Sequence, residues 1–352
     1  MPKTILHITD VLTIGGTEVL LAGTVPELSE YRHIVVYLKG ENKFEEALKG
    51  IPVICLHHSG KFSLFRTAKR LRKIIKTFKV DTIHAHLIWS RFVAALAKTS
   101  RIRMIASVHS VISKDAFEKN KLSRWMEKYT AKKVDDLICV SQFVLDDYTK
   151  YIPFKGRTHL LHNFIPDLFF NTVPQNNFEF NTGKTIRCIA IGSLKEAKNY
   201  AYTLQAFSLL PGKQFSLDIV GNGPLKEKLQ LIIDEKKLPV QLLGGRQDIP
   251  TLLKNYDVFI QSSLHEGFGI AAAEAIAGGL IPVLSDIPAH KEITNRLATF
   301  FSTENPNSLA NALKGLLDKP IDLQRLQELR KYIRSIAGKD NYLTKLKKIY
   351  DL

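Results

Sequence analysis

Short apolar runs rich in β-branched residues recur along the chain, and segments with the apolar spacing of an α-helix separate them. A parallel sheet requires both features, because its strands are buried on two faces and each needs a crossover helix to reach the next. The alternation therefore predicts an α/β protein with doubly wound, Rossmann-like parallel sheets. The predicted strands are residues 4–9, 33–38, 53–56, 81–85, 104–108, 136–140 and 158–161 in the first half of the chain, and 186–191, 215–220, 240–243, 258–260 and 281–284 in the second.

The length of 352 residues is about twice that of an ordinary domain, so we expect two domains, each with its own core. A stretch rich in Asn, Pro, Gln and Thr, without sustained periodicity, predicts a linker over residues 166–184. The predicted domains are residues 1–165 and 185–335, facing each other across a cleft. Residues 336–352 are expected to form a final helix that packs back towards the first domain.

Composition excludes several classes of protein. Hydrophobic residues make up 45% of the chain, too much for a disordered protein. Cys55, Cys139 and Cys188 lie far apart in apolar runs, which predicts buried, reduced thiols and neither disulfides nor a zinc site. The chain begins without the pattern of a signal peptide and has no run of about 18 apolar residues, so we expect a cytoplasmic protein without a membrane span.

The net charge is the unusual part of the composition. Lys and Arg number 50 against 34 Asp and Glu, a formal charge of +16, which favours an anionic partner. Nucleic acid, anionic lipid and phosphorylated substrates all fit such a charge. Neither aromatic stacking motifs nor a recognition helix accompany it, so we expect no nucleic-acid binding.

The loop after the first predicted strand contains Gly15 and Gly16 before a helix expected to begin near Thr17. Adjacent glycines let backbone amides approach a phosphate, although a plain tight turn has the same sequence. A dinucleotide-binding fingerprint would need Gly-x-Gly-x-x-Gly here and an acidic residue closing the second strand, where the sequence has Leu38 and Lys39. Nicotinamide-dependent chemistry is therefore disfavoured.

The most informative segment is residues 265–275, which read His-Glu-Gly-Phe-Gly-Ile-Ala-Ala-Ala-Glu-Ala and follow a predicted strand. The order of strand, glycine loop and helix places a helix N-terminus beside Glu266, and Glu274 lies about a turn and a half into that helix. The two carboxylates are expected to lie several ångströms apart, too far to form a metal pair. They are suited to reading hydroxyl groups, since a carboxylate accepts two hydrogen bonds from a vicinal diol.

With this segment and a series of further motifs, the sequence resembles the retaining nucleotide-sugar glycosyltransferases of family 4, which have the GT-B fold. The family motif is two glutamates separated by seven residues, here Glu266 and Glu274. The other matching positions, in chain order, are Gly15-Gly16-Thr17-Glu18, His109, Val140-Ser141, His162-Asn163, Lys198-Asn199, Val220-Gly221-Asn222-Gly223-Pro224 and Leu243-Gly244.

The resemblance implies a UDP- or GDP-linked sugar held mainly by the second domain. Glu274 would hold the ribose hydroxyls, Glu266 the transferred sugar and Lys198 the diphosphate. His109 would contact the sugar near the reacting carbon, although a histidine at a strand end can also be satisfied by backbone alone. The implied catalytic residues are His109, Lys198 and Glu266. The implied donor-binding residues are Gly15, Gly16, Gly192, Ser193, Lys198, Gly244, Arg246, Glu266, Gly267, Phe268, Gly269, Ile270 and Glu274.

One position departs from the family pattern. Relatives commonly carry Arg where this chain has Ser193, so the diphosphate lacks one fixed cation unless Lys195 replaces it. The sequence contains neither Asp-x-Asp nor His-Glu-x-x-His, and we expect no metal and no cofactor. The family is thought to transfer the sugar with retention of configuration to a glycan or lipid-linked acceptor in surface polysaccharide or lipopolysaccharide synthesis. A nucleotide-sugar epimerase and a catalytically silent nucleotide-sugar sensor stay open as alternatives.

A basic amphipathic helix is predicted over residues 64–79. Its apolar residues recur at helical spacing. The same pattern also fits an ordinary crossover helix that packs on the sheet and has a solvated outer face. The excess of cations favours an anionic membrane surface as a partner, and hence a peripheral location at the inner face of the membrane. The predicted membrane-facing cations are Arg66, Lys69, Arg70, Arg72, Lys73 and Lys76, with a second basic stretch at Lys119, Lys121, Arg124, Lys128, Lys132 and Lys133 beside Trp125.

Overall fold

A computed structural model describes residues 2–13, 15–60, 63–118, 121–171, 184–211, 214–318 and 321–352. The chain forms two compact units, residues 1–163 with 340–352, and residues 164–339. Most of the predicted linker, residues 172–183, and Lys119 of the second basic stretch lie outside the described residues. Within the described part of the chain, no helix is both long and apolar enough to cross a membrane.

The first unit is built on a seven-stranded parallel sheet with the strand order β3-β2-β1-β4-β5-β6-β7. The strands are β1 (Thr4–Thr9), β2 (Arg32–Tyr37), β3 (Val53–Cys55), β4 (Thr82–Ala85), β5 (Arg103–Val108), β6 (Asp136–Cys139) and β7 (Arg157–Leu160). The helices are α1 (Gly16–Thr24), α2 (Leu64–Phe78), α3 (Ile88–Ala97), α4 (Lys121–Ala131), α5 (Gln142–Tyr151) and α14 (Lys339–Asp351).

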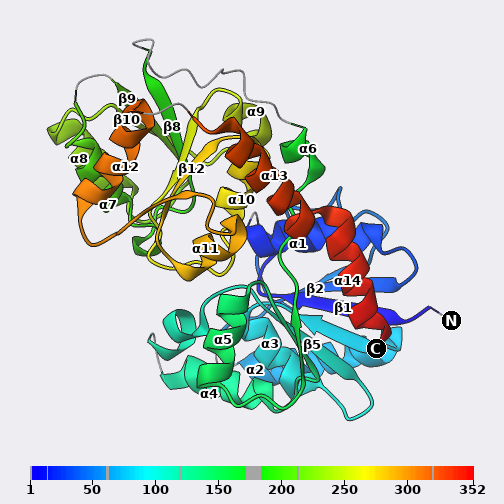
Figure 1. Ribbon diagram of the computed structural model, residues 1–352. Coiled ribbons are helices and arrows are strands. Elements are labelled where there is room, and N and C mark those ends of the chain that lie inside the picture. The colour runs from blue at the N-terminus through cyan, green and yellow to red at the C-terminus, as the bar shows by residue number, and fades with distance from the viewer. Residues whose placement is uncertain are drawn as a thin grey trace. The chain divides into compact units, whose positions relative to one another are not determined.

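The last helix, α14, belongs to the first unit although it ends the chain (Figure 1). Its Tyr350 is buried, and the hydroxyl lies 2.7 Å from Nδ1 of His84 on β4. Lys3 donates a hydrogen bond to the Tyr350 carbonyl, and the Tyr31 hydroxyl donates one to Asp351. These contacts join the first strands of the chain to its last turn.

The second unit repeats the arrangement with a six-stranded parallel sheet in the order β10-β9-β8-β11-β12-β13. Its strands are β8 (Ile186–Ile191), β9 (Phe215–Val220), β10 (Val240–Gly244), β11 (Val258–Gln261), β12 (Ile281–Ser285) and β13 (Thr299–Phe301). Its helices are α6 (Asp167–Phe170), α7 (Tyr200–Phe207), α8 (Lys226–Glu235), α9 (Ile249–Leu253), α10 (Ile270–Ala277), α11 (Pro288–Thr294), α12 (Pro306–Asp318) and α13 (Leu323–Ala337).

The α/β prediction with two parallel sheets is confirmed, and each of the twelve predicted strands lies within one residue of an observed one. The short strand β13 was not predicted, because three residues at a sheet edge are too few to show a pattern. In both sheets the strand order reverses beside the first strand of the unit, between β1 and β4 and between β8 and β11. Ligands of such sheets bind at this switch point.

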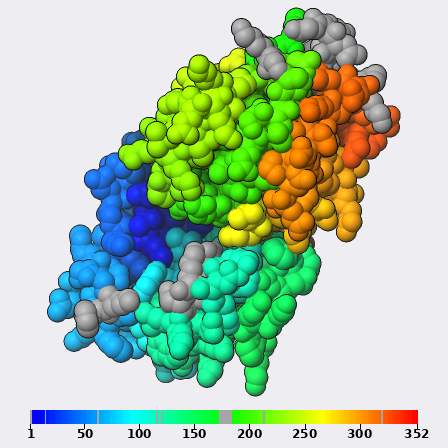
Figure 2. All heavy atoms as spheres, turned by 90° about the vertical axis from the view of Figure 1, so that its left-hand side faces the viewer, coloured from blue at the N-terminus to red at the C-terminus, as the bar shows by residue number. Residues whose placement is uncertain are grey.

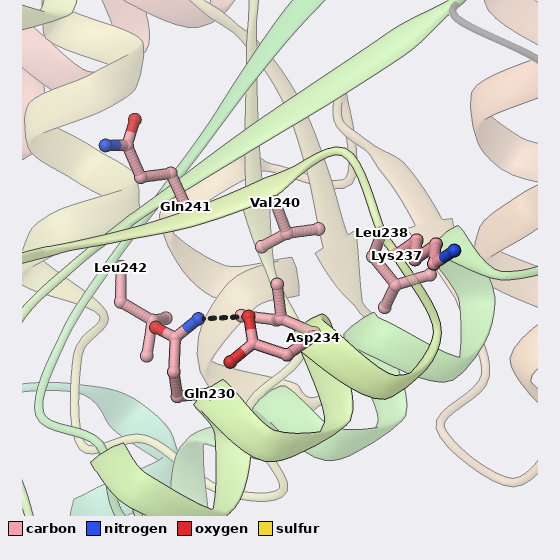
Figure 3. Close-up of a pocket in the computed structure, with 8 residues that line it drawn as sticks. Gln230, Asp234, Lys237, Leu238, Val240, Gln241 and Leu242 are labelled. Carbon is pink, nitrogen blue, oxygen red and sulfur yellow. Dashed lines mark hydrogen bonds between the residues drawn. The ribbon is translucent and has the colours of Figure 1, made fainter.

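The second unit also has a shallow hollow that is not at its switch point. It has a volume of about 670 Å³ between α8 and the edge strand β10, where the Gln230 side chain donates a 2.9 Å hydrogen bond to Asp234 (Figure 3). None of its lining residues is a predicted site residue.

Candidate functional site

The switch point of the second sheet brings together Lys198, which follows β8, and Glu266, which follows β11. Their charged groups form an ion pair, with Nζ of Lys198 2.5 Å from Oε1 of Glu266, and the two side chains are 19% and 14% exposed. Sixty-seven residues separate them in the sequence. The register of two neighbouring parallel strands therefore assembles the pair that the sequence motifs predicted separately.

Glycines create the space for Lys198. A Cβ on Gly192, directly after β8, would lie 2.9 Å from Cε of the lysine. A Cβ on Gly221 would lie 1.9 Å from the carbonyl oxygen of Gly192, so only glycine allows these two loops to approach this closely. Leu194 donates a backbone hydrogen bond to Asn222, which ties the loops together. The predicted motif at residues 220–224 thus supports the lysine loop.

Three donors converge on one oxygen of Glu266. Besides Lys198, the Gln261 amide and the Ser263 hydroxyl each donate a 2.6 Å hydrogen bond to Oε1. Burial by itself would raise the pKa of Glu266, but Lys198 and Ser263 outweigh it and hold that pKa below its usual value. The carboxylate is therefore ionised at neutral pH and fixed in place by its first oxygen, which leaves the second oxygen to accept hydrogen bonds from a ligand.

Helix α10 begins immediately after this carboxylate. Its N-cap residue is Gly269, whose φ of 91° favours glycine, and no side chain caps the helix start. The first amides of a helix lack intrahelical acceptors and attract negative charge. Gly267, Phe268 and Gly269 are buried, so the loop presents backbone more than side chains.

Glu274, one turn further along α10, has the opposite protonation state. Burial raises the pKa of its carboxyl to about 8, so most of this group carries a proton at pH 7. The two glutamates of the motif therefore differ in charge in the unliganded protein. The sequence prediction treated both as carboxylates, and the difference comes from Lys198, which is paired with Glu266.

The remaining predicted donor-binding residues of this unit include Ser193, which follows β8, and Gly244 and Arg246 at the carboxyl end of the edge strand β10. Gly244 ends β10 with a φ of 70°, and Arg246 forms a two-pronged pair with the Asp248 carboxylate at 2.8 and 2.6 Å. Ser193 is half-buried, whereas Lys195, the predicted substitute for the missing arginine, is exposed.

In the first unit, Gly15 and Gly16 begin α1 as predicted, directly after the β1 loop. A Cβ on Gly15 would lie 2.5 Å from Oε2 of Glu18, so the glycine makes room for this buried carboxyl group. The Thr9 hydroxyl donates to the other oxygen at 3.3 Å. Burial raises the pKa of Glu18, with Thr9 acting in the opposite direction.

His109 follows β5 and ends a row of histidines across one face of the sheet. His33, His7, His84 and His86 form the rest of this row, with ring centroids 4.3–6.2 Å apart along it. Burial, reinforced by the charge of Arg91, lowers the pKa of His109 to about 3. The imidazole is therefore neutral at physiological pH, which suits hydrogen bonding and excludes a standing positive charge.

His7, His84 and His86 each place a potential metal-ligand atom within 4.8 Å of the others. The two ring nitrogens of His84 lie 2.7 Å from the Tyr350 and Ser107 hydroxyls, however. Burial lowers the pKa of all three histidines. Burial therefore keeps these three imidazoles neutral within the core of the unit.

The predicted basic helix is α2, and all six of its named cations are exposed. Two of them nevertheless have partners within the unit: Arg70 donates to the Leu56 carbonyl, and Arg72 donates to the Leu96 and Ala97 carbonyls at the end of α3. All six lie on the exposed surface of α2, and their contact with a membrane stays a prediction. Arg72 stabilises the C-terminus of α3, where positive charge is favourable.

Sequence reasoning missed three residues of the second unit. Gln261 and Ser263 hold Glu266, and buried His290 lies beside Gly269, with Nδ1 3.0 Å from the Ser285 carbonyl. Nε2 of His290 has no hydrogen-bond partner among the described residues. The change from apolar to polar residues at the end of strand β11 could have indicated Gln261 and Ser263 from the sequence. No local sequence pattern indicated His290.

Both parallel sheets have the Rossmann strand order, and the second carries a cation and a carboxylate at its switch point. Two family models match the chain: "Glycosyltransferase Family 4" over residues 14–167 and "Glycosyl transferases group 1" over residues 174–338. The chain belongs to glycosyltransferase family 4.

Two relatives match this chain over most of its length, and a solved structure shares its fold. An Escherichia coli UDP-Gal:alpha-D-GlcNAc-diphosphoundecaprenol alpha-1,3-galactosyltransferase is 27% identical over 86% of this chain and 82% of its own length. An O-antigen biosynthesis glycosyltransferase of the same species, WclY, is 22% identical over 85% of this chain and 84% of its own length. The structure of HepE from Anabaena with UDP-glucose superposes with a TM-score of 0.85 at 16% identity, covering 99% of this chain and 100% of HepE.

Proposed function

We propose that the protein is a retaining, metal-independent glycosyltransferase that moves a hexose or N-acetylhexosamine from a nucleotide-diphosphate sugar to a hydroxyl of a glycan or lipid-linked acceptor. The observation that carries the proposal is the Lys198–Glu266 pair beside the uncapped start of α10. A cation, a fixed carboxylate and exposed helix amides are the groups that a sugar linked to a diphosphate requires.

Each group has a distinct task in this proposal. Lys198 and the first amides of α10 stabilise the negative charge that develops on the diphosphate as the bond to the sugar breaks. The second oxygen of Glu266 accepts hydrogen bonds from the sugar hydroxyls and fixes the orientation of the ring. Glu274 binds the ribose diol, and neutral His109 offers a hydrogen bond to the sugar without adding a competing positive charge.

The relatives support a role in surface polysaccharide or O-antigen synthesis. The Escherichia coli galactosyltransferase is named for UDP-Gal as donor and a diphosphoundecaprenol-linked GlcNAc as acceptor. These two compounds are therefore the first pair to test, within a panel of UDP- and GDP-sugars. We expect transfer of the sugar to the acceptor. NMR should show that the product keeps the α configuration of the donor, and EDTA should leave the activity unchanged. Donor consumption without an acceptor would favour the epimerase alternative, and tight donor binding without turnover the sensor alternative.

We also propose that the first unit docks on an anionic membrane, where a lipid-linked acceptor resides. Helices α2 and α4 both pack against α3, and their segments, light blue and turquoise in Figure 2, lie at the molecular surface. Phe65 on α2 is 80% exposed and Trp125 on α4 is 54% exposed, and both lie beside exposed lysines. Aromatic side chains among cations are suited to a lipid interface. Binding to vesicles with anionic lipid, and none to neutral vesicles, is the expected outcome.

A further inference from the structure

The switch point of the first sheet contains a cavity of about 200 Å³ that no predicted site residue lines. It lies beyond the carboxyl ends of β1, β2 and β3, at the start of α3. Its lining residues are Asp10, Leu38, Lys39, His58, Gly60 and Trp89. Pockets for drug-sized ligands measure ~300–1,000 Å³, so this cavity suits a single ring.

The hydrogen bonds around His58 determine which of its nitrogens carries the proton. Nδ1 lies 3.0 Å from both the Ser63 and the Thr67 hydroxyl oxygens. Those hydroxyls donate their own hydrogens to backbone carbonyls, Ser63 to Gly60 and Thr67 to Ser63. The hydroxyl oxygens therefore act as acceptors towards the ring, and Nδ1 of His58 must be the donor.

It follows that Nε2 of His58 bears a lone pair. Burial, with the charge of Lys39, lowers the pKa of His58, so the ring stays neutral and this lone pair persists at physiological pH. His58 lines the cavity, so this lone pair is the hydrogen-bond acceptor that its ring can offer to a ligand.

Asp10 supplies a second hydrogen-bond acceptor. Its Oδ1 accepts a 2.7 Å hydrogen bond from the Ser90 amide in the first turn of α3, which holds the carboxyl group at the cavity wall. The Trp89 backbone also hydrogen-bonds this carboxyl group, whose two oxygens together can accept about four hydrogen bonds and so have room for one more from a ligand. Asp10 directly follows β1, whereas His58 lies beyond β3, so two acceptors reach the cavity from different strands.

Trp89 provides an apolar wall opposite these polar groups. Its half-buried indole is 6.3 Å from the His58 ring, between centroids, and the buried side chain of Leu38 lies on the same cavity. A flat aromatic face, two acceptors and one lysine donor match a pyranose, which has an apolar C–H face and a rim of hydroxyls. A phosphate group fits poorly, because the Asp10 carboxyl and the His58 lone pair both present acceptor oxygens or nitrogens to it and Lys39 is the single cation among the described residues that line the cavity.

We propose that this cavity binds one pyranose ring of the acceptor carbohydrate. The ring packs on the Trp89 indole and its hydroxyls donate to Asp10 and to Nε2 of His58, while Lys39 donates to a ring or hydroxyl oxygen. The assignment to the acceptor rests on the glycosyltransferase function proposed above; the binding of a sugar ring rests on the cavity itself.

The chain has two tryptophans, Trp89 and Trp125, which allows a direct test. In a Trp125→Phe background, the fluorescence of Trp89 reports on the cavity alone. Methyl glycosides of galactose, glucose, mannose and N-acetylglucosamine are titrated to tens of millimolar, with inorganic phosphate and UDP in parallel. A saturable change in emission with at least one glycoside is expected, and Trp89→Phe, which keeps only Trp125, should show none.

Two variants test the polar groups. Asp10→Asn keeps an oxygen that can accept from the Ser90 amide, so the start of α3 is preserved, and His58→Phe keeps an aromatic ring without a lone pair. Each should weaken glycoside binding at least tenfold. Asp10→Asn should leave thermal unfolding unchanged, whereas His58→Phe also loses the hydrogen bonds to Ser63 and Thr67, so its thermal unfolding must show that it stays folded at the temperature of the titration. In transfer assays each should raise the KM for acceptor and leave the KM for donor unchanged.

Several outcomes would overturn the proposal: no response to any glycoside, a response to phosphate or UDP alone, or equal binding in the Asp10→Asn and His58→Phe variants. Because the fluorescence titration requires no turnover, its result is separate from that of the transfer assay. Glycoside binding without transfer would reject the proposed function and leave this inference standing, and transfer without glycoside binding would do the reverse.

Discussion

The two units hold ion pairs of the same chemistry in different surroundings. In the first unit, Arg91 of α3 pairs with Glu127 of α4, and the side chains are 4% and 1% exposed. In the second, Lys198 and Glu266 are 19% and 14% exposed and lie beside a helix start without a side-chain cap. The first pair is sealed within the helical layer, whereas the second stands where a ligand can reach it.

Arg91 shows what the sealed pair does. Its guanidinium also donates to the Ser107 carbonyl on β5, and its charge contributes to the low pKa of His109. The pair thus supports the fold and keeps the histidine at the end of β5 neutral. In the proposed function, the Lys198–Glu266 pair instead positions two groups for a ligand outside the protein. Exposure, more than the identity of the charges, distinguishes a structural pair from a functional one here.

Breaking the sealed pair should have the largest effect. Glu127→Gln leaves the Arg91 charge buried with a neutral partner, and we expect a loss of about 3–5 kcal/mol in the free energy of unfolding. Urea-induced unfolding followed by circular dichroism measures it. Glu118→Gln, which removes the partner of Lys114 in an exposed pair, is the control and should cost less than about 1 kcal/mol. Equal effects of the two changes would show that burial does not make the Arg91–Glu127 pair more important for stability than an exposed pair.

Breaking the open pair should affect catalysis more than folding. Glu266→Ala removes the group that orients the sugar, and we expect transfer to fall by about 10²–10³-fold while UDP affinity stays nearly unchanged. Glu274→Ala should instead weaken UDP binding. Initial rates and calorimetric titration with UDP test the division, with Glu235→Ala on the exposed face of α8 as the control. The proposed division of roles between Glu266 and Glu274 fails if the two variants lose the same amount of nucleotide affinity.

The raised pKa of Glu274 should make the affinity for UDP depend on pH. Its pKa of about 8 means that the free protein holds a proton there below pH 8. Two hydrogen bonds from a ribose diol favour the ionised form, so UDP binding should release this proton and become stronger as the pH rises towards 8, by at most about tenfold per pH unit. Above pH 8 the affinity should level off. Calorimetry in buffers of different ionisation enthalpy detects the proton, and a flat pH profile in Glu274→Gln is the control.

The smallest effects are expected on the outer face of the first unit. Lys69→Gln and Lys73→Gln on α2 should each weaken binding to anionic vesicles by about 1 kcal/mol, because each removes one exposed cation from the surface. Lys226→Gln and Lys228→Gln on α8 of the second unit are matched controls that should leave vesicle binding unchanged. Equal losses for both pairs would point to net charge as the cause, with no docking face on the first unit.

Much of the fold was predictable because it is encoded locally. Buried strands of a parallel sheet are continuous apolar runs, so their limits could be found to within a residue. The motif from Glu266 to Glu274 is likewise local, since a strand end, a glycine loop and a helix start are consecutive. The difference in protonation between these two glutamates was not predictable, because it depends on Lys198, which is distant in the sequence.

The sequence by itself determined the two parallel sheets, the family of the protein and the candidate residues that follow each strand. Only the tertiary structure decided which side chains meet there: Gln261 and Ser263 around Glu266, the histidine row ending at His109, and Asp10 with His58 and Trp89. The physical reason is that parallel strands bring their carboxyl ends to one edge in the order of the sheet, and that order differs from the order of the chain.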